Sequence, residues 1–164
     1  PCTAHTTASD ALWAGLPVLT QSGQSLGARV AASVLNAVGL PELVTTSVDE
    51  YEQLAIHLAT HSDEMRALKQ KLAEALKMKG AWDAHRQELA HFVADLSRLH
   101  ADQDRIRKNL ANTPREAEVY QVYLKKLSDQ EKEIDTLTAK QKQTMAAEFA
   151  AKKSYEDYLA NLTD

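Results

Sequence analysis

The stretch Asn112-Thr113-Pro114-Arg115-Glu116 interrupts a long part of the chain that otherwise contains almost no glycine or proline. Thr113 can act as an N-cap, Pro114 suits the first position of a helix, and Glu116 completes a capping box. We therefore predict a turn near residues 111–114, with a new helix beginning there. The stretches on either side are each about 48 residues, or roughly 72 Å of helix, which predicts an antiparallel hairpin.

Apolar residues recur at heptad spacing on both sides of this turn. The column before the turn consists of Leu68, Ala75, Trp82, Leu89, Leu96, Gln103 and Leu110, with Phe92, Leu99 and Ile106 three residues on. The column after the turn consists of Tyr120, Leu127, Ile134, Tyr155 and Leu162. Such a repeat is typical of a coiled coil. Residues 61–164 are therefore predicted to be an antiparallel helical hairpin, with Trp82 in its seam.

The first part of the chain has a different composition. Residues 1–60 hold one basic residue, Arg29, and five acidic ones, whereas residues 61–164 hold 18 of each sign. The order is a helix over 10–14 ended by Gly15, a strand over 17–20, a helix over 26–38 closed by Gly39, a short extended piece, and a helix that starts at the capping box Ser47–Glu50. This order is typical of α/β wound domains. The predicted fold class is mostly α, with a truncated α/β Rossmann-like fragment over 1–60 followed by the hairpin.

Composition also limits the classes of partner and compartment. The net charge of −4 supplies no basic field for nucleic acid and no polybasic surface for anionic lipid. A single cysteine, Cys2, excludes an intrachain disulfide and a cysteine-based zinc site. No apolar run is long enough to span a bilayer. We expect a cytoplasmic protein without nucleic-acid or membrane partners, and a sequence that begins at Pro1 through processing, trimming or engineering.

Three motifs in the first 72 residues carry a family resemblance. They are His5-Thr-Thr-Ala-Ser-Asp-Ala-Leu-Trp-Ala-Gly15, Pro17-Val-Leu-Thr20 and Gly23-Gln-Ser-Leu-Gly-Ala-Arg-Val-Ala-Ala-Ser33. With them the sequence resembles the O-linked N-acetylglucosamine transferase family. The resemblance implies the C-terminal lobe of a two-lobed Rossmann-like glycosyltransferase that uses a UDP-sugar, UDP-N-acetylglucosamine. It also implies that His5, Thr6 and Thr7 contact the diphosphate and that Asp10 contacts the ribose.

Elementary chemistry agrees with these roles. Two threonines at a helix start present hydroxyl groups and unpaired N–H groups where a diphosphate is stabilised, and a carboxylate one turn on can accept ribose hydroxyls. In the alternative interpretation, Thr6 and Thr7 only cap the helix and Asp10 only complements the helix dipole. The residues alone leave both interpretations open.

The resemblance sets an expectation for function. We expect a C-terminal fragment with a remnant UDP-sugar site and no other cofactor, which does not catalyse alone because the facing lobe and upstream basic residues are not in this sequence. Residues 99–162 resemble a coiled-coil hairpin of an uncharacterised bacterial family, which indicates a natural fusion or an engineered chimera. The alternative is a non-catalytic structural or protein-interaction module. Expected partners are a larger glycosyltransferase assembly, a protein bound through the hairpin, or a second copy packed on residues 12–44, because the strand over 17–20 would otherwise lack a neighbour.

Other patterns are read as structural. The segment Gly23-Gln-Ser-Leu-Gly27 matches the G-x-S-x-G nucleophile elbow, with Asp49 and His57 following in hydrolase order, but we favour Ser25 as a helix cap. His57 and His61 have the spacing of a metal pair, yet a helix start at Ser62 is expected to separate them. We expect no metal site, a solvated acidic face at Asp129, Glu131, Glu133 and Asp135, and a buried Trp13.

Overall fold

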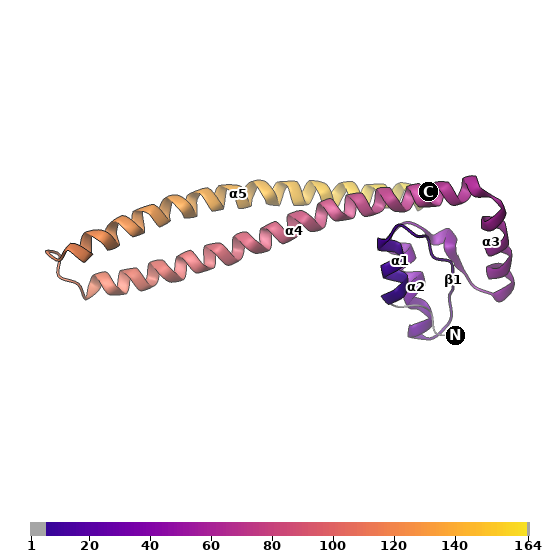
Figure 1. The fold of residues 1–164 in the computed structure, drawn as a ribbon, viewed down its shortest axis with the longest axis horizontal. Helices are drawn as coiled ribbons and strands as arrows, with labels where there is room; N and C mark the ends of the chain where they lie inside the picture. Colours follow the sequence, from indigo (N-terminus) through magenta and orange to yellow (C-terminus); the bar gives the residue numbers. More distant parts are fainter. Residues whose placement is uncertain (1–5, 164) are drawn as a thin grey trace. The chain divides into compact units, whose positions relative to one another are not determined.

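The computed structural model describes residues 6–163, and the chain is mostly helical, as predicted. In chain order the elements are α1 (Thr6–Trp13), β1 (Thr20–Gln21), α2 (Leu26–Ala37), a 3-10 turn η1 (Pro41–Leu43), β2 (Val44–Thr45), α3 (Val48–Thr60), α4 (Ser62–Ala111) and α5 (Glu118–Thr163) (Figure 1). The chain forms two compact units. We call Pro1–Ala81 with Ala151–Asp164 the N-terminal unit, and Trp82–Ala150 the helix-pair unit.

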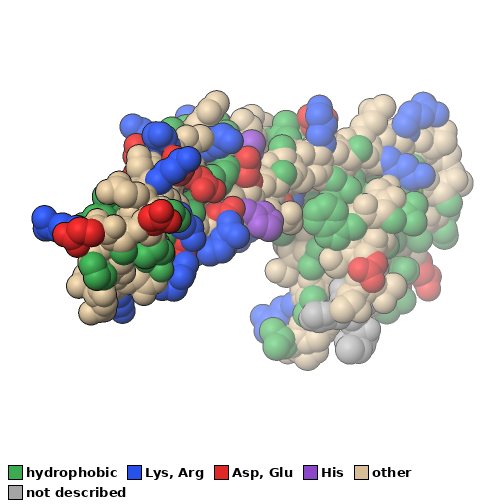
Figure 2. All heavy atoms as spheres, turned by 60° about the vertical axis from the view of Figure 1, so that its left-hand side comes forward, with side chains coloured by type: hydrophobic (Ala, Val, Ile, Leu, Met, Phe, Trp, Pro, Cys, Tyr) green, Lys and Arg blue, Asp and Glu red, His purple; other side chains and the backbone are tan. Residues whose placement is uncertain are grey.

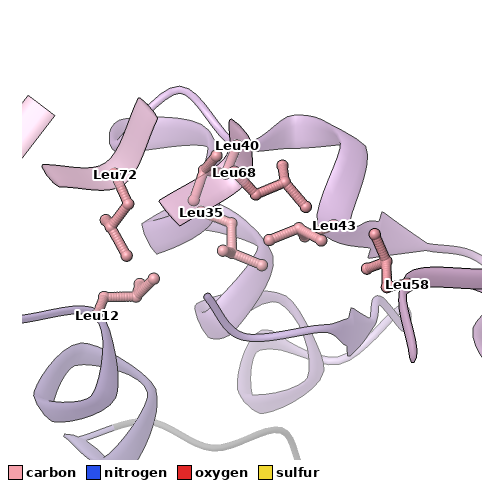
Figure 3. Close-up of a cluster of buried hydrophobic side chains, with 7 residues drawn as sticks. All are labelled: Leu12, Leu35, Leu40, Leu43, Leu58, Leu68 and Leu72. Atoms are coloured by element: carbon pink, nitrogen blue, oxygen red, sulfur yellow. The ribbon is translucent and has the colours of Figure 1, made fainter. Parts of the chain in front are cut away.

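The boundary between these units differs from the predicted one after residue 60. The start of α4 contributes Leu68 and Leu72 to the same buried cluster as residues of α1, α2, η1 and α3, as Figure 3 shows. The members of that cluster are Leu12, Leu35, Leu40, Leu43, Leu58, Leu68 and Leu72. The apolar face at the start of α4 is buried against residues that are remote in the sequence, so this compact unit extends beyond residue 60, where the sequence predicts the change of domain.

The two short strands pair with each other. β1 runs parallel to β2, with Thr20 opposite Val44 and Gln21 opposite Thr45, and α2 lies between them in the sequence. The Thr45 hydroxyl also donates to the Thr20 carbonyl oxygen at 3.1 Å. The strand predicted at 17–20 is therefore displaced and has a neighbour, which removes one reason for expecting a dimer. Self-association itself stays a prediction.

Two glycines end helices as predicted. Gly15 and Gly39 have φ values of +77° and +72°, a conformation that side chains with a Cβ rarely adopt. After α2, the Leu40 N–H donates to the Leu35 carbonyl oxygen at 3.0 Å, which closes a Schellman-type turn. The last turns of α5 pack here, since a Cβ on Gly39 would lie 2.6 Å from Leu162 Cδ1.

In the helix-pair unit, α4 and α5 run antiparallel, and hydrogen bonds join them (Figure 1). Thr144 donates to Glu88 at 3.2 Å, and Gln130 donates to Asp102 at 2.7 Å, so that residue numbers fall along α5 as they rise along α4. The predicted seam contains buried Leu99 and Ile106. It also buries polar side chains, namely Gln103, Gln130 and Thr144.

The turn between the long helices differs from the prediction in detail. α4 ends at Ala111 and α5 begins at Glu118. The assignment of Thr113 as an N-cap is wrong, because its hydroxyl donates to the Asn109 carbonyl oxygen at 2.7 Å and so satisfies the end of α4. A further turn follows, in which the Ala117 N–H donates to the Pro114 carbonyl oxygen at 3.1 Å, and this turn delays the start of α5.

Figure 2 shows charged side chains of both signs interspersed over the helix pair. Asp129, Glu131, Glu133 and Asp135 are exposed, as expected. Over residues 6–163, no helix is long and apolar enough to cross a membrane.

Candidate functional site

The candidate diphosphate site lies at the start of α1. Ala8 and Leu12 are buried on one face of this helix, and Leu12 belongs to the leucine cluster. Thr6, Thr7 and Asp10 are exposed on the remaining surface. α1 begins at Thr6, so the two threonines lie in its first turn rather than before it. His5, the fourth predicted site residue, lies outside the described residues.

The first turn of α1 has the groups that a phosphate-binding site needs. The first N–H groups of a helix have no partner within the helix, and its dipole places partial positive charge at the same end. Thr6 and Thr7 add two hydroxyl groups there, so the first turn of α1 can donate several hydrogen bonds to phosphate oxygens. Asp10 lies one helical turn further on, where its carboxylate can accept hydrogen bonds from vicinal hydroxyl groups. Arg29 is the single Lys or Arg among residues 1–60, so this segment can offer one permanent cation to a bound phosphate.

The carboxyl ends of the two parallel strands form a second polar edge in the N-terminal unit. The N–H of Ser22, the first residue after β1, donates to the carbonyl oxygen of Thr45, the last residue of β2, at 2.7 Å. Gly23 approaches α2 so closely that a Cβ on it would lie 2.8 Å from Ala28 Cβ. Ligands of open α/β sheets commonly bind at this edge.

Ser25 is the N-cap of α2, as predicted, and its hydroxyl accepts a 3.3 Å hydrogen bond from the Ala28 N–H. The two residues that would complete a hydrolase triad, Asp49 and His57, both belong to α3. His57 Nε2 contacts Glu64 Oε2 at 2.8 Å, and Asp49 is an exposed residue in the first turn of α3. The elbow motif therefore serves helix capping.

The capping box at the start of α3 is present with one change of partner. Ser47 accepts a hydrogen bond from the Glu50 N–H at 3.2 Å, as predicted. The Glu50 carboxylate, however, accepts 2.8 Å bonds from both the N–H and the hydroxyl of Thr46. These bonds, the one from the Thr46 backbone first, lower the pKa of Glu50. The sequence pattern identified Ser47 and Glu50 and missed Thr46, for which the repeated hydroxyls of Thr45-Thr46-Ser47 were the available signal.

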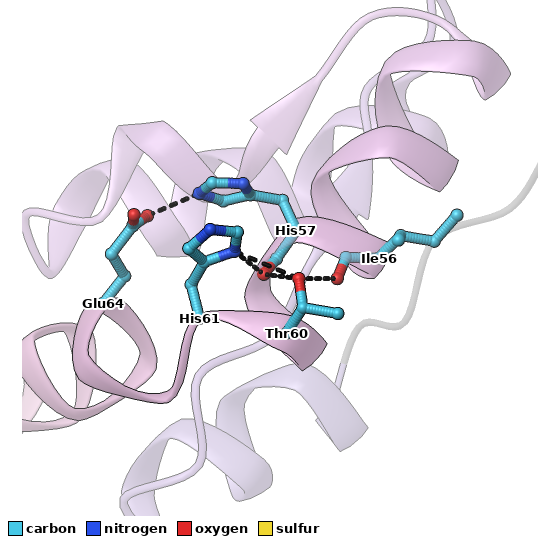
Figure 4. A network of polar contacts seen from close by, with 5 residues as sticks. All are labelled: Ile56, His57, Thr60, His61 and Glu64. Carbon is cyan, nitrogen blue, oxygen red and sulfur yellow. Dashed lines mark hydrogen bonds and ion pairs between the residues drawn. The ribbon is translucent and has the colours of Figure 1, made fainter.

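The two histidines at the junction of α3 and α4 are stacked (Figure 4). α4 does begin at Ser62, but this break does not separate the imidazoles, whose centroids lie 3.9 Å apart. His57 faces Glu64, and His61 Nδ1 lies 2.8 Å from the His57 carbonyl oxygen. Within the described part of the chain, no group of three or more His, Cys, Asp or Glu residues could hold a metal ion.

Trp13 is not buried as expected, because 56% of its surface is exposed. It borders a cavity of about 260 Å³ that also involves α2, α4 and α5. Sequence reasoning missed this cavity, since its walls come from four segments remote in the chain. The position of Trp13 next to the helix-ending pair Ala14-Gly15 is a weak signal that its side chain lies at the edge of the core.

The similarity to known proteins lies in the part of the chain that holds this candidate site. Residues 1–92 match the family described as Glycosyl transferase family 41. A UDP-N-acetylglucosamine–peptide N-acetylglucosaminyltransferase of Caenorhabditis elegans is 37% identical over 95 residues, which are 58% of this chain and 8% of that protein. No solved structure gives a significant match to the chain.

Two plant proteins named "probable UDP-N-acetylglucosamine–peptide N-acetylglucosaminyltransferase" are also similar. The SEC protein of Arabidopsis thaliana is 39% identical over 72 residues, 43% of this chain and 7% of that protein. The SPINDLY protein of Petunia hybrida is 31% identical over 106 residues, 63% of this chain and 11% of that protein. The chain thus spans about a tenth of the length of these relatives. The family match reaches residue 92 rather than residue 72, so it includes the first part of α4. Because this match covers more than half of the 164 residues, the chain belongs to glycosyl transferase family 41.

Proposed function

We propose that the N-terminal unit contributes to the donor site of a family 41 glycosyltransferase and binds the nucleoside diphosphate of a UDP-sugar. In this proposal the first turn of α1 holds the diphosphate through Thr6 and Thr7, and Asp10 holds the ribose. His5 is a further diphosphate contact in the same proposal. The proposal is supported by membership of the family and by the names of the relatives. The observation that carries it is the exposure of Thr6, Thr7 and Asp10 on a helix anchored through Leu12.

Electrostatics sets the expected strength of binding. Phosphate sites gain much of their affinity from Lys or Arg side chains that form charge-assisted hydrogen bonds. Residues 1–60 offer Arg29 alone, so we expect weak binding of UDP by this chain and no sugar transfer without further parts of a transferase. The Rossmann-like character of the fragment and a cytoplasmic location belong to the same proposal.

The test is a titration of the labelled chain with UDP, uridine and 2′-deoxy-UDP, followed by the amide signals of α1. UDP is expected to shift the signals of Thr6 and Thr7 and to bind more tightly than uridine, because the diphosphate supplies the anionic oxygens. Thr7→Val should reduce the preference for UDP over uridine. Asp10→Asn should reduce the preference for UDP over 2′-deoxy-UDP. In the proposal the Asp10 carboxylate accepts a hydrogen bond from the ribose 2′-hydroxyl, which 2′-deoxy-UDP lacks.

Asp49→Asn is the matched control. Asp49 is also an exposed acidic residue in the first turns of a helix, α3, so its replacement changes the net charge equally. UDP binding should be unchanged in this variant. Signals that move at the start of α3 and not at α1, or no shift at millimolar UDP, would refute the assignment.

The alternative function, a structural or protein-interaction module, is supported by the extent of the helices. Most of the helix pair lies beyond residue 92, outside the family match. We propose that this coiled-coil hairpin acts as a spacer or docking arm, in a homodimer or in a larger glycosyltransferase assembly. Sedimentation equilibrium at micromolar concentration tests the homodimer, and a monomer at all concentrations would exclude it.

A further inference from the structure

The buried seam divides the surface of the helix pair into two flanks. On α4, Gln103 and Ile106 are buried in this seam. With 3.6 residues per helical turn, Asp102 lies beside Ile106 on one side of the seam, and Arg107 lies beside Gln103 on the other. Asp102 and Arg107 therefore belong to opposite flanks.

An ion pair to α5 crosses each flank. Arg107 lies 3.6 Å from Glu131, and we call this side the Arg107 flank. Asp102 lies 2.9 Å from Lys126, and we call the other side the Lys126 flank. Side chains seven residues apart share a face in a coiled coil, and side chains three or four apart are neighbours on it. Spacing from these four residues therefore assigns other residues to a flank.

The Arg107 flank carries a group of exposed apolar side chains. Val93 precedes Arg107 by two heptads, and Met145 follows Glu131 by two heptads. Val93 and Met145 are therefore related across the flank as Arg107 and Glu131 are, and Phe149 follows Met145 by one helical turn. Val93, Met145 and Phe149 are 57%, 57% and 68% exposed.

Such a group is unusual beside the seam of two helices. The positions that flank an a/d seam commonly hold Glu and Lys, which pair across it. When one flanking position is apolar as well, the stripe is as wide as that of a helix that packs against more than one neighbour. The Arg107 flank thus has an apolar surface that the helix pair by itself leaves in water.

The charges on the Arg107 flank nearly balance. Over residues 83–107 of α4 and 124–149 of α5 they are Arg86, Arg107, Lys142, Asp83, Asp104, Glu131 and Asp135. Arg107 pairs with both Asp104 and Glu131, and Arg86 lies 3.6 Å from Asp83. A flank whose charges nearly cancel does not select a strongly acidic or basic partner, and it does not repel a copy of itself.

The size of the flank suits a whole second helix pair. The part of α4 in the helix-pair unit runs from Trp82 to Ala111, which is about 45 Å of helix. Two helices side by side are roughly 20 Å wide, so one flank offers on the order of 900 Å². Each partner in a stable interface buries about 800 Å².

We propose that the Arg107 flank is the contact between two copies of this chain, which lie side by side about a twofold axis along the helix pair. The proposal rests on the homodimer proposed for the helix pair above. In this arrangement each α4 lies antiparallel to the α5 of the other copy, as in an up-down-up-down four-helix bundle. Val93, Met145 and Phe149 of both copies then lie at the same level and cover one another.

Sedimentation equilibrium of matched variants tests the surface. The unmodified chain should dimerise in the micromolar range. Phe149→Glu should raise the dimer dissociation constant at least about tenfold, because it places a charge in the apolar centre of the interface. Val122→Glu is the control, since Val122 is 61% exposed and lies one turn from Lys126 on the other flank. It should change the constant less than about twofold.

Circular dichroism melts show whether both variants remain folded, as expected at exposed positions. Equal effects of Phe149→Glu and Val122→Glu would overturn the assignment of the flank. A chain that is monomeric throughout the micromolar range would overturn both this proposal and the homodimer.

A third variant separates this surface from one on the N-terminal unit. Leu26, at the start of α2, is 80% exposed and belongs to the 12–44 segment that the sequence analysis expects in a dimer. Leu26→Glu should leave the dissociation constant within about twofold of that of the unmodified chain. If Leu26→Glu separates the dimer and Phe149→Glu does not, the homodimer stands and the Arg107 flank is the wrong surface.

The direction of the second copy is measured at the turn between the long helices. The chain has one cysteine, Cys2, so Cys2→Ser with Arg115→Cys gives a single site for a spin label on the exposed Arg115 position. Copies that lie side by side in the same direction should give a label-to-label distance within a few helix diameters, about 40 Å. A dimer with no distance in this range would overturn the twofold arrangement.

Discussion

The Tyr155 hydroxyl donates a 2.8 Å hydrogen bond to the carbonyl oxygen of Ala37, the last residue of α2. The final carbonyl groups of a helix have no donors within the helix. Tyr155 supplies one from α5, and its own side chain is buried. The end of α5, outside the family match, is thereby joined to the segment that belongs to the family.

Tyr155→Phe should therefore destabilise the N-terminal unit. The substitution removes the donor while the ring still fills its place, so the expected loss is about 1 kcal/mol in the free energy of unfolding. Thermal and urea denaturation measure it. Tyr51→Phe, on an exposed residue of α3, is the control and should have little effect. Equal stability of the Tyr155 variant and the unmodified chain would contradict the role of this bond.

Gly39→Ala and Gly15→Ala form a matched pair. Both positions have positive φ, so each alanine should cost roughly 1 kcal/mol in backbone conformation. At Gly15 a Cβ would meet nothing within 4 Å, but at Gly39 it would lie 2.6 Å from Leu162 Cδ1 and 3.1 Å from Leu159 Cδ2. Gly39→Ala should cost more in unfolding experiments and increase proteolysis at the end of α5. If the two substitutions cost the same, α5 does not pack on Gly39.

Asp102 makes the stability of the helix pair depend on pH. Lys126 first, then Arg105 and Gln130, hold the pKa of Asp102 well below its usual range. Because the pKa is lower in the folded state, this carboxylate stabilises the fold above its unfolded pKa of about 4, and the contribution is lost as pH falls further. Asp102→Asn should therefore lower stability at neutral pH, with a difference that narrows as the solution becomes more acidic.

Asp104→Asn is the control for this prediction. Asp104 is an exposed residue two positions away that pairs with Arg107 at 3.2 Å on the helix surface. Exposed pairs contribute little, so we expect a small effect of Asp104→Asn at every pH. Urea denaturation between neutral and acidic pH compares the variants. A constant difference between Asp102→Asn and the unmodified chain would be inconsistent with the lowered pKa.

The buried glutamines should set the pairing of the two helices. Gln103 and Gln130 are 2% and 8% exposed, and Gln130 Oε1 has no hydrogen-bond partner. Replacing both with leucine removes the Gln130 acceptor that has no partner and adds apolar surface to the seam, and it also removes the bonds of the glutamines to Asp102, Glu131 and Arg107. Those three partners keep contact with water, so we expect the first effect to be larger and the melting temperature to rise. The replacement should also increase association, because polar groups in an apolar seam specify register and partner number. Sedimentation velocity with the exposed Gln143→Leu as control distinguishes a seam effect from surface stickiness, and a lower melting temperature would count against this account.

Thr113 distinguishes the predicted N-cap from the observed contact with Asn109. A donor is needed to reach the Asn109 carbonyl oxygen, whereas an N-cap needs an acceptor. Thr113→Ser should preserve stability, and Thr113→Asp should lose about 1 kcal/mol because an ionised carboxylate cannot donate. Chemical denaturation decides between them. Full stability of the Asp variant would restore the N-cap assignment.

The sequence by itself determined the features that depend on neighbours a few residues away. Glycines at positions 15 and 39 end helices because they accept positive φ, and Ser25 and Ser47 cap helices because their acceptors lie three residues from the N–H groups they bind. The heptad repeat predicted two long helices because the spacing of apolar residues is also a local property of the chain. The exposed faces of α1 that carry Thr6, Thr7 and Asp10 were predictable as well, because helical periodicity separates them from Leu12.

Only the tertiary structure decided what depends on remote partners. Trp13 is exposed at the border of a cavity formed by four remote segments, and Gln130 is buried where its amide donates to Asp102 of the other long helix. The N-terminal unit continues to Ala81 and includes the end of α5. Leu72 belongs to the same cluster as leucines of α2 and η1, and Tyr155 donates to the last residue of α2, so both contacts join residues that lie far apart in the chain. Burial is a property of the assembled surfaces, and periodicity shows which residues share a face without showing what covers that face.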